Sequence, residues 1–169
     1  MSRSGAAGGG RAELLGELSV AARHYTAAYA LFNQALADHF GLHPTDVQCL
    51  NLLSLESDPV TIGRVGELTG LSTGSATRLV DRLERAGYVT RTRDSEDRRR
   101  VLVTTVPERM AAFGEVWKEL SGAWWHMFDD YDEEDLALLL THMRRTVELS
   151  TAQIARLRTG SLPHPPAPH

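Results

Sequence analysis

The charged side chains with the clearest chemical potential are concentrated in one stretch of the chain, residues 71–105. This stretch has eight arginines and five acidic residues, a local charge of +3, although the 169-residue protein as a whole carries −4. Guanidinium groups bind phosphate oxygens through charge-assisted hydrogen bonds, and a basic patch on an acidic protein is typical of nucleic-acid binding. The eight arginines are Arg78, Arg82, Arg85, Arg91, Arg93, Arg98, Arg99 and Arg100.

The first half of this stretch predicts a helix suited to the major groove of DNA. Ser72 is a favourable N-cap for it. The apolar stripe at helical spacing consists of Ala76, Leu79, Val80 and Leu83. The N-terminal end has small polar side chains, so the backbone could approach base edges. The candidate DNA-contacting residues are Ser72, Thr73, Gly74, Ser75, Thr77, Arg78 and Arg82. The alternative is a surface helix with solvated arginines.

The second half contains DSEDRRRVLV, residues 94–103, in which a charged segment stands directly before a β-branched run. Residues 88–93 and 101–106 both have strand-like composition. The two runs therefore predict a hairpin with the charged residues at its tip. A solvated tip with no partner is the alternative to a DNA contact.

The elements that must position these groups are predicted from hydrophobic periodicity and from cap residues. Helical patterns cover about residues 12–39, 44–55, 62–69, 73–86, 107–128 and 133–157. A short helix, a glycine-containing turn, a polar-faced helix and a hairpin together form a winged helix-turn-helix. The predicted fold class is mostly α with a small β-hairpin wing, and further helices precede and follow the winged region.

The run LTGLSTGSATRLVDRLERAGYVTRTRDSEDRRRVLVTT, residues 68–105, resembles the core of the MarR (multiple antibiotic resistance regulator) family of winged-helix transcription factors. The resemblance continues through GLHPTDVQCLNLL, residues 41–53, and the helix order agrees over about residues 12–157. It implies a homodimer in which helices from both termini interlock. It also implies that recognition helices enter successive major grooves and that the wings reach neighbouring minor grooves.

The family's wing motif, Asp-x-Arg, falls on Asp97-Arg98-Arg99 of this sequence. The resemblance implies that Arg99 enters the minor groove, where a narrow groove concentrates negative potential. It implies that Asp97 restrains the wing or that arginine through an ion pair. We expect Arg98 and Arg100 to contact phosphates.

Composition and resemblance together predict the organisation of the chain. Both ends are rich in residues that bury little apolar surface, so we expect them to be disordered. The predicted parts are a disordered tail at 1–10, an N-terminal dimerisation helix at 11–40, a winged helix-turn-helix at 41–106, C-terminal dimerisation helices at 107–157 and a second disordered tail at 158–169.

Five aromatic or imidazole side chains could line a ligand cavity between the winged region and the dimerisation helices. The resemblance implies that small aromatic or lipophilic molecules bind there. Aromatic residues at helical spacing more often form a core or a dimer interface, and that alternative stays open. The candidate residues are His24, Tyr25, Tyr29, Trp117 and Trp124.

Two further features have a structural and a chemical interpretation. Cys49 is the only cysteine, so it forms no internal disulfide, and it is either an inert core thiol or a redox sensor. His39 and His43 have the spacing of a metal-binding pair, but Gly41 between them favours loop or dimer-contact histidines. We expect no metal and no cofactor.

Several function classes are disfavoured. The sequence has no Gly-rich phosphate loop, no G-x-S-x-G, no H-E-x-x-H and no paired cysteines, so we expect no enzyme. It has no apolar run of about 18 residues and no secretory signal pattern, so we expect a cytoplasmic protein. The predicted function is a homodimeric repressor that binds a pseudo-palindromic site in double-stranded DNA and is released by a small-molecule effector. The alternative is a winged-helix ligand or metal sensor that acts mainly through a protein partner.

Overall fold

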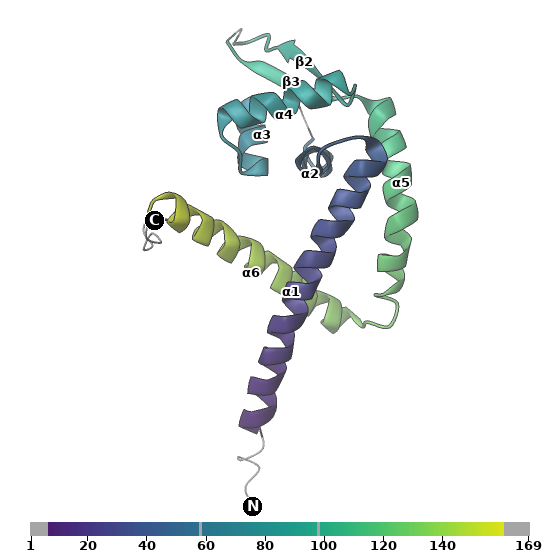
Figure 1. Ribbon diagram of the computed structural model, residues 1–169, viewed down its shortest axis with the longest axis vertical. Helices are drawn as coiled ribbons and strands as arrows, with labels where there is room; N and C mark the ends of the chain where they lie inside the picture. Colours follow the sequence, from purple (N-terminus) through teal and green to yellow (C-terminus); the bar gives the residue numbers. More distant parts are fainter. Residues whose placement is uncertain (1–6, 58, 98, 161–169) are drawn as a thin grey trace, which may run out of the picture. The chain divides into compact units, whose positions relative to one another are not determined.

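A computed structural model describes residues 7–57, 59–97 and 99–160, which form a mostly helical fold with a small sheet (Figure 1). The chain divides into two compact units, residues 1–113 and 114–169. The helices are α1 (Ala7–Phe40), α2 (Pro44–Leu53), α3 (Ile62–Thr69), α4 (Thr73–Arg85), α5 (Pro107–His126) and α6 (Glu133–Arg158). The strands are β1 (Val60–Thr61), β2 (Val89–Arg93) and β3 (Val101–Thr105). The predicted fold class is therefore confirmed.

The helix-turn-helix consists of α3 and α4, and local sequence determines where both helices end or begin. Gly70 adopts a left-handed conformation, with φ of 72°, directly after α3. Ser72 Oγ accepts a hydrogen bond from the Ser75 N–H at 3.4 Å and so caps α4 as predicted. A Cβ on Gly66 would lie 3.0 Å from the Leu71 carbonyl oxygen. Glycine at that position allows α3 to approach the turn closely.

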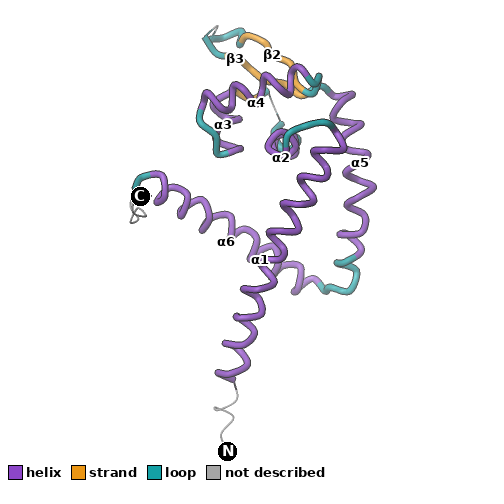
Figure 2. The backbone as a smooth tube through the Cα atoms, in the orientation of Figure 1, coloured by secondary structure: helices purple, strands orange, loops and turns teal. Residues whose placement is uncertain are grey.

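The hairpin of the wing belongs to a three-stranded antiparallel sheet with the strand order β1-β3-β2. Its strands β2 and β3 are orange in Figure 2. In the predicted hairpin, Val89 pairs with Thr105 and Arg93 pairs with Val101, so β2 and β3 stay in register up to the charged tip. The third strand, β1, pairs with β3 and was not predicted. A two-residue strand has no periodicity to detect, and its partner lies far along the chain.

The core of the first unit includes the apolar stripe of α4, which is completely buried as predicted. Side chains from α2, α3, β2 and β3 complete this core. Its fully buried members include Val47, Leu50, Val65, Ala76, Leu79, Val80, Leu83, Val89 and Val103. The core therefore fixes α4 by its inner face and leaves the opposite face for contacts.

Helices α1 and α6 extend into both stretches that composition predicted to be disordered tails. Residues 7–10 are already part of α1, although the sequence predicted a disordered tail over 1–10. Extending an existing helix gains one hydrogen bond per residue without a new nucleation cost, which offsets the poor helix propensity of glycine. Arg158, predicted to begin the second tail, is the last residue of α6. The remaining tail residues, 1–6 and 161–169, lie outside the described residues.

The second helix is shorter than its apolar pattern predicted. The pattern extended it to about residue 55, but α2 ends at Leu53, and Leu55 is 79% exposed. At the helix end the Ser54 N–H donates to the Leu50 carbonyl and the Leu55 N–H donates to the Leu52 carbonyl, and the chain then turns toward β1. Leu55 is therefore a surface residue rather than a core residue.

Two helices carry apolar rows that are exposed in the single chain. On α6 the residues of the row are four, three, four, seven and three positions apart, which fits the heptad spacing of a coiled-coil seam. It consists of Leu136, Leu140, Met143, Val147, Ile154 and Leu157, which are 41–66% exposed. On α1, Leu18, Tyr25 and Tyr29 are similarly exposed, at 56%, 67% and 44%. Each helix therefore has an apolar face available to another helix.

We expect the Leu79→Ala variant to lose about 2–5 kcal/mol of folding free energy, because truncating a fully buried leucine leaves a cavity in the core. Thermal unfolding followed by circular dichroism measures this loss. Leu55→Ala is the matched control and should change stability by less than about 0.5 kcal/mol, because Leu55 is mostly exposed. Equal losses in the two variants would contradict the core described above.

Candidate nucleic-acid interface

The N-terminal turn of α4 presents a small, polar and open surface. Ser72, Thr73 and Gly74 are exposed, and Ser75 is half-buried beside them. A Cβ on Gly74 would meet no heavy atom within 4 Å, so this part of the backbone is accessible. The Thr77 hydroxyl lies one turn further on and donates to the Thr73 carbonyl at 2.8 Å. The positive end of the helix dipole lies at this surface and favours a phosphate there.

Arg78 and Arg82 were predicted to have the same role, but their surroundings differ. Arg78 is exposed, and its Nη2 donates to Ser75 Oγ at 3.1 Å; it forms no ion pair within the described ranges. Arg82 instead donates from Nε to Asp46 Oδ2 at 2.9 Å and from Nη2 to Asp46 Oδ1. Asp46 lies on α2 and is only 1% exposed. Its hydrogen bond to Arg82 raises the pKa of that guanidinium above its ordinary value.

Arg91, on β2, joins the wing to the recognition helix, and the sequence reasoning missed this role. Its Nη1 lies 2.6 Å from Asp81 Oδ1 and 3.0 Å from Glu84 Oε2. Its Nη2 donates to the Thr77 carbonyl at 3.2 Å. Because both acids lie on α4, Arg91 offsets part of their negative charge and holds β2 against the helix (Figure 1). The sequence signal for this role was a pair of acids three residues apart, followed by an arginine in the first wing strand.

Asp97 shapes the tip of the wing through backbone hydrogen bonds. Its Oδ1 accepts from the Arg99 N–H at 3.0 Å, and its carbonyl accepts from the Arg100 N–H at 2.8 Å. Among the described residues, the ion pair at the tip joins Arg100 to Asp94 at 3.6 Å, and none of these residues forms an ion pair with Asp97. The Arg99 guanidinium is exposed and pairs with no acid among the residues described. Arg98 lies outside the described residues.

Two further arginines belong with these exposed cations and were not predicted as site residues. Arg85, in the last turn of α4, donates from Nε to the Asp81 carbonyl at 3.1 Å. Arg93 is exposed at the end of β2, where it pairs with Val101 across the hairpin. Neither forms an ion pair in the part of the chain that the structure describes. Their membership of the arginine-rich stretch was the only signal in the sequence.

The predicted ligand-lining residues fall into two groups on different units of the chain. His24, Tyr25 and Tyr29 lie on α1, where the two tyrosine rings stack with centroids 6.3 Å apart. Trp117 and Trp124 lie on α5, with ring centroids 6.5 Å apart. A ligand cavity formed by both groups stays a prediction.

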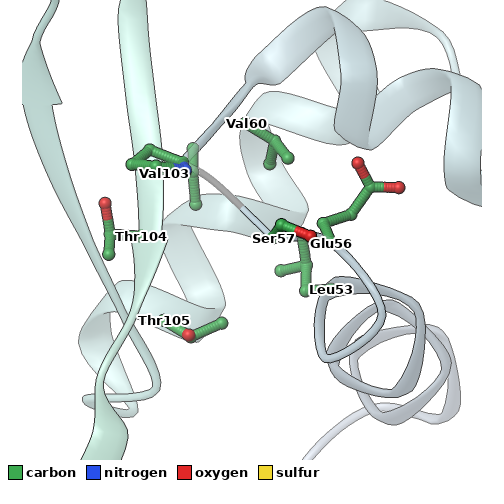
Figure 3. A pocket seen from close by; sticks show the side chains of 8 residues that line it. Leu53, Glu56, Ser57, Val60, Val103, Thr104 and Thr105 are labelled. Carbon is green, nitrogen blue, oxygen red and sulfur yellow. The ribbon is translucent and has the colours of Figure 1, made fainter.

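A different cavity, of about 120 Å³, lies between the end of α2 and the sheet (Figure 3). Leu53 and Glu56 line one side of it, and Val60, Val103 and Thr105 line the strand side. Ligand pockets usually measure about 300–1,000 Å³. This cavity is therefore too small for an aromatic effector of ordinary size.

The surroundings of Cys49, His39 and His43 favour structural roles for these side chains. Burial raises the pKa of the Cys49 thiol to about 12, and the nearby Asp46 charge adds to the shift. The reactive thiolate is therefore scarce near neutral pH, which favours an inert core thiol. His43 Nδ1 accepts from the Thr45 N–H at 3.3 Å, and the His39 ring packs against Phe40. Within the described residues, no three His, Cys, Asp or Glu side chains are grouped to hold a metal.

We expect Cys49 in the folded protein to resist thiol-specific reagents at pH 8, because the thiol is fully buried and its pKa is high. Absorbance titration with a disulfide reagent measures the reaction, and the same protein unfolded in urea is the control. The unfolded chain should react with one equivalent. Rapid stoichiometric reaction of the folded protein would contradict the inert role.

Comparison with known proteins gives two sequence matches. The sequence model of the MarR family matches residues 40–100. The chain is 39% identical over 128 residues to "Uncharacterized HTH-type transcriptional regulator YcgE" of Bacillus subtilis (strain 168). The matched region covers 76% of this chain and 82% of that protein.

Solved structures share the fold at lower identity. A MarR family protein from Bacillus stearothermophilus has a TM-score of 0.64 and 22% identity, over 82% of this chain and 96% of its own. AbfR, solved in its reduced form bound to DNA, has a TM-score of 0.58 and 22% identity, over 83% of this chain and 96% of its own. Across the helices that the structure describes, none has the length and apolar character required to cross a membrane.

Proposed function

The chain belongs to the MarR family, and from this premise we propose that it is a transcriptional regulator that binds a specific site in double-stranded DNA as a homodimer. One observation carries the proposal: α4 exposes a small polar N-terminal turn beside Arg78, and the adjoining wing exposes Arg99 at its tip. A helix of this kind fits the major groove, and an exposed arginine fits the narrow minor groove.

The proposed contacts divide between the helix and the wing. Side chains and backbone of residues 72–78 read base edges or bind a phosphate at the start of α4. Arg99 enters the minor groove, and Asp97 holds the tip in the conformation that presents it. Arg98 and Arg100 contact phosphates; Arg100 is 56% exposed despite its contact with Asp94. AbfR, a protein of the same fold, was solved bound to DNA, which supports DNA binding by a chain of this fold.

The proposed homodimer rests on the apolar rows of α1 and α6. Large exposed apolar faces mark protein interfaces, and heptad spacing suits a helix from a second copy of the chain. Two-fold symmetry places two copies of α4 on the same face of the duplex. The half-sites would then lie about 34 Å apart, one turn of DNA.

We further propose that the protein acts in the cytoplasm as a repressor and that a small aromatic or lipophilic molecule releases it from DNA. The aromatic side chains of α1 and α5 support an effector of this class, because stacked rings recognise apolar and aromatic ligands. A panel of such compounds, added to the protein–DNA complex, tests the release by loss of fluorescence anisotropy.

Selection from a random duplex library tests the DNA-binding proposal. The expected product, called the selected duplex below, contains two inverted half-sites whose centres lie about one helical turn apart. Failure to enrich any sequence from the library would contradict sequence-specific binding. Such a failure, together with a stable complex with another protein, would favour a sensor that acts through a protein partner.

A further inference from the structure

Among the described residues of the winged region, the most deeply buried charge lies between α2 and α4. Asp46, on α2, is 1% exposed, and its partner Arg82 lies near the C-terminal end of α4. We propose that Asp46 and Arg82 form a latch that sets the orientation of α4, and that Arg82 is a positioning residue rather than a DNA contact. The inference rests on the proposed function, because it concerns binding to the same DNA.

The contacts of the latch restrain orientation as well as distance. Two nitrogens of Arg82, Nε and Nη2, donate to the two carboxylate oxygens of Asp46. A bidentate pair of this kind fixes the plane of the guanidinium against the plane of the carboxylate. Arg82 Nη2 also lies 3.5 Å from Thr45 Oγ1, which in turn lies 2.8 Å from His43 Nδ1. The polar contacts therefore extend from the segment after α1 to the recognition helix.

The surroundings of Asp46 make its partner hard to replace. Val47, Cys49 and Leu50 on the same helix are fully buried, so the carboxylate stands at the edge of an apolar core. Removing Arg82 would leave this carboxylate without a counter-charge, and water could solvate it only if the packing opened. The pair therefore selects one arrangement of α2 against α4.

The position of the latch connects two functional surfaces. α1, which carries one of the proposed dimerisation rows, contacts α2, and α2 contacts α4. The N-terminal turn of α4 lies about 15 Å along the helix from Arg82, at a rise of about 1.5 Å per residue. A tilt of about 10° around Arg82 would move that turn by roughly 2.6 Å, far beyond the roughly 0.5 Å that base recognition tolerates.

In a homodimer, such a tilt changes the distance between the two recognition helices. The latch should therefore control how strongly the protein distinguishes the correct half-site spacing from a neighbouring one. A direct phosphate contact by Arg82 would have a different effect, since it contributes affinity at every spacing and adds about 0.9 to the salt slope of binding.

The Asp46→Asn variant separates the two roles by the sign of its effect. The substitution removes a negative charge, so electrostatics alone predicts tighter binding to DNA. The latch predicts weaker binding, by about tenfold or more, because the asparagine cannot hold the guanidinium with two charged oxygens. Fluorescence anisotropy with the selected duplex, and with duplexes one base pair shorter and longer between half-sites, measures affinity and spacing preference.

Arg82→Met and Arg82→Lys complete the series. The latch predicts that both Arg82 variants bind DNA more weakly and show less preference for the correct half-site spacing. It also predicts that the salt slope of binding by Arg82→Met equals that of the wild type. Adding Arg82→Met to Asp46→Asn should cause little further loss, because both changes break the same interaction. A smaller folded fraction would lower the affinity for all duplexes equally, so the spacing preference separates positioning from stability.

Each outcome decides between the roles. Unchanged or tighter binding by Asp46→Asn, or a slope reduced by about 0.9 in Arg82→Met with spacing preference retained, would overturn the latch. If Asp46→Asn fails to fold, Arg82→Lys, which keeps the positive charge but not the bidentate geometry, is judged by the same spacing preference. Failure of the wild-type protein to enrich any duplex from the library would contradict the proposed function itself, whatever the variants do.

Discussion

The Arg99→Ala variant is expected to bind the selected duplex about 10- to 100-fold more weakly than the wild type, with fold and oligomeric state unchanged. A charge-assisted hydrogen bond contributes about 1.5–3 kcal/mol, and each 1.4 kcal/mol is a factor of ten in affinity. Arg99 suits this role because its guanidinium is exposed, while its N–H is fixed by Asp97 at 3.0 Å. Electrophoretic mobility shift and fluorescence anisotropy measure the loss.

Arg11→Ala is the matched control for Arg99→Ala, since it removes the same charge from an exposed position near the start of α1. Arg11 lies about 45 Å along α1 from the end of that helix, at a rise of about 1.5 Å per residue. The control should leave the affinity close to that of the wild type. Binding by Arg99→Ala that equals binding by Arg11→Ala would contradict the role of the wing.

The Val147→Asp variant is expected to dissociate the proposed homodimer. Its affinity for the selected duplex should then fall by about 10²–10⁴-fold, because the two half-sites are bound by separate molecules and the gain from linked binding is lost. Val147 lies in the middle of the apolar row of α6 and is 66% exposed in the single chain. Burying an unpaired carboxylate at a helix–helix interface is strongly unfavourable. Sedimentation velocity measures the oligomeric state, and anisotropy measures the affinity.

Ala152→Asp provides the same new charge on the opposite side of α6. At 100° per residue, position 152 lies away from the row that contains Val147, and Ala152 is exposed. This control should remain dimeric and bind DNA normally. A Val147→Asp variant that stays dimeric, or a wild type that is monomeric, would show that the row on α6 has another partner.

The elements nearest to the proposed interface were predictable because their signals are local. The Ser72 cap, the buried stripe of α4 and the hairpin between residues 88 and 106 each depend on a few adjacent residues. Strand β1 was missed because two residues, Val60 and Thr61, show no alternation and become a strand only by pairing with β3. The early start of α1 was missed for a related reason, because composition alone treats glycines as breakers even where a long helix continues through them.

The roles of individual arginines were harder to predict, because charge pairing depends on contacts between distant residues. Arg82 and Arg78 share a face in any helical projection, yet only Arg82 meets the carboxylate of Asp46, which lies 36 positions earlier. Arg91 was counted only as part of the basic stretch, although its contacts with Asp81 and Glu84 join the wing to α4. A single sequence reveals that arginines cluster but does not reveal which of them are already paired.

This difference changes the electrostatic description of the interface. The net charge of the stretch from 71 to 105 is +3, but several of its arginines neutralise acids of the same domain. The cations without an acidic partner in the described residues are Arg78, Arg85, Arg93 and Arg99, and together with the exposed Arg100 they supply the field available to DNA. Their positions on α4 and the wing, rather than the total charge, explain how an acidic protein can bind a polyanion.

The central claim is that α4 and the wing bind a specific DNA sequence. The most direct test compares the affinity of the wild type for the selected duplex with its affinity for a scrambled duplex of the same composition. Both affinities are measured over a range of salt concentrations. We predict that the selected duplex binds at least about 10³-fold more tightly at physiological salt and that log affinity falls linearly with log salt concentration. Equal affinities for the two duplexes, or binding that does not respond to salt, would contradict the claim.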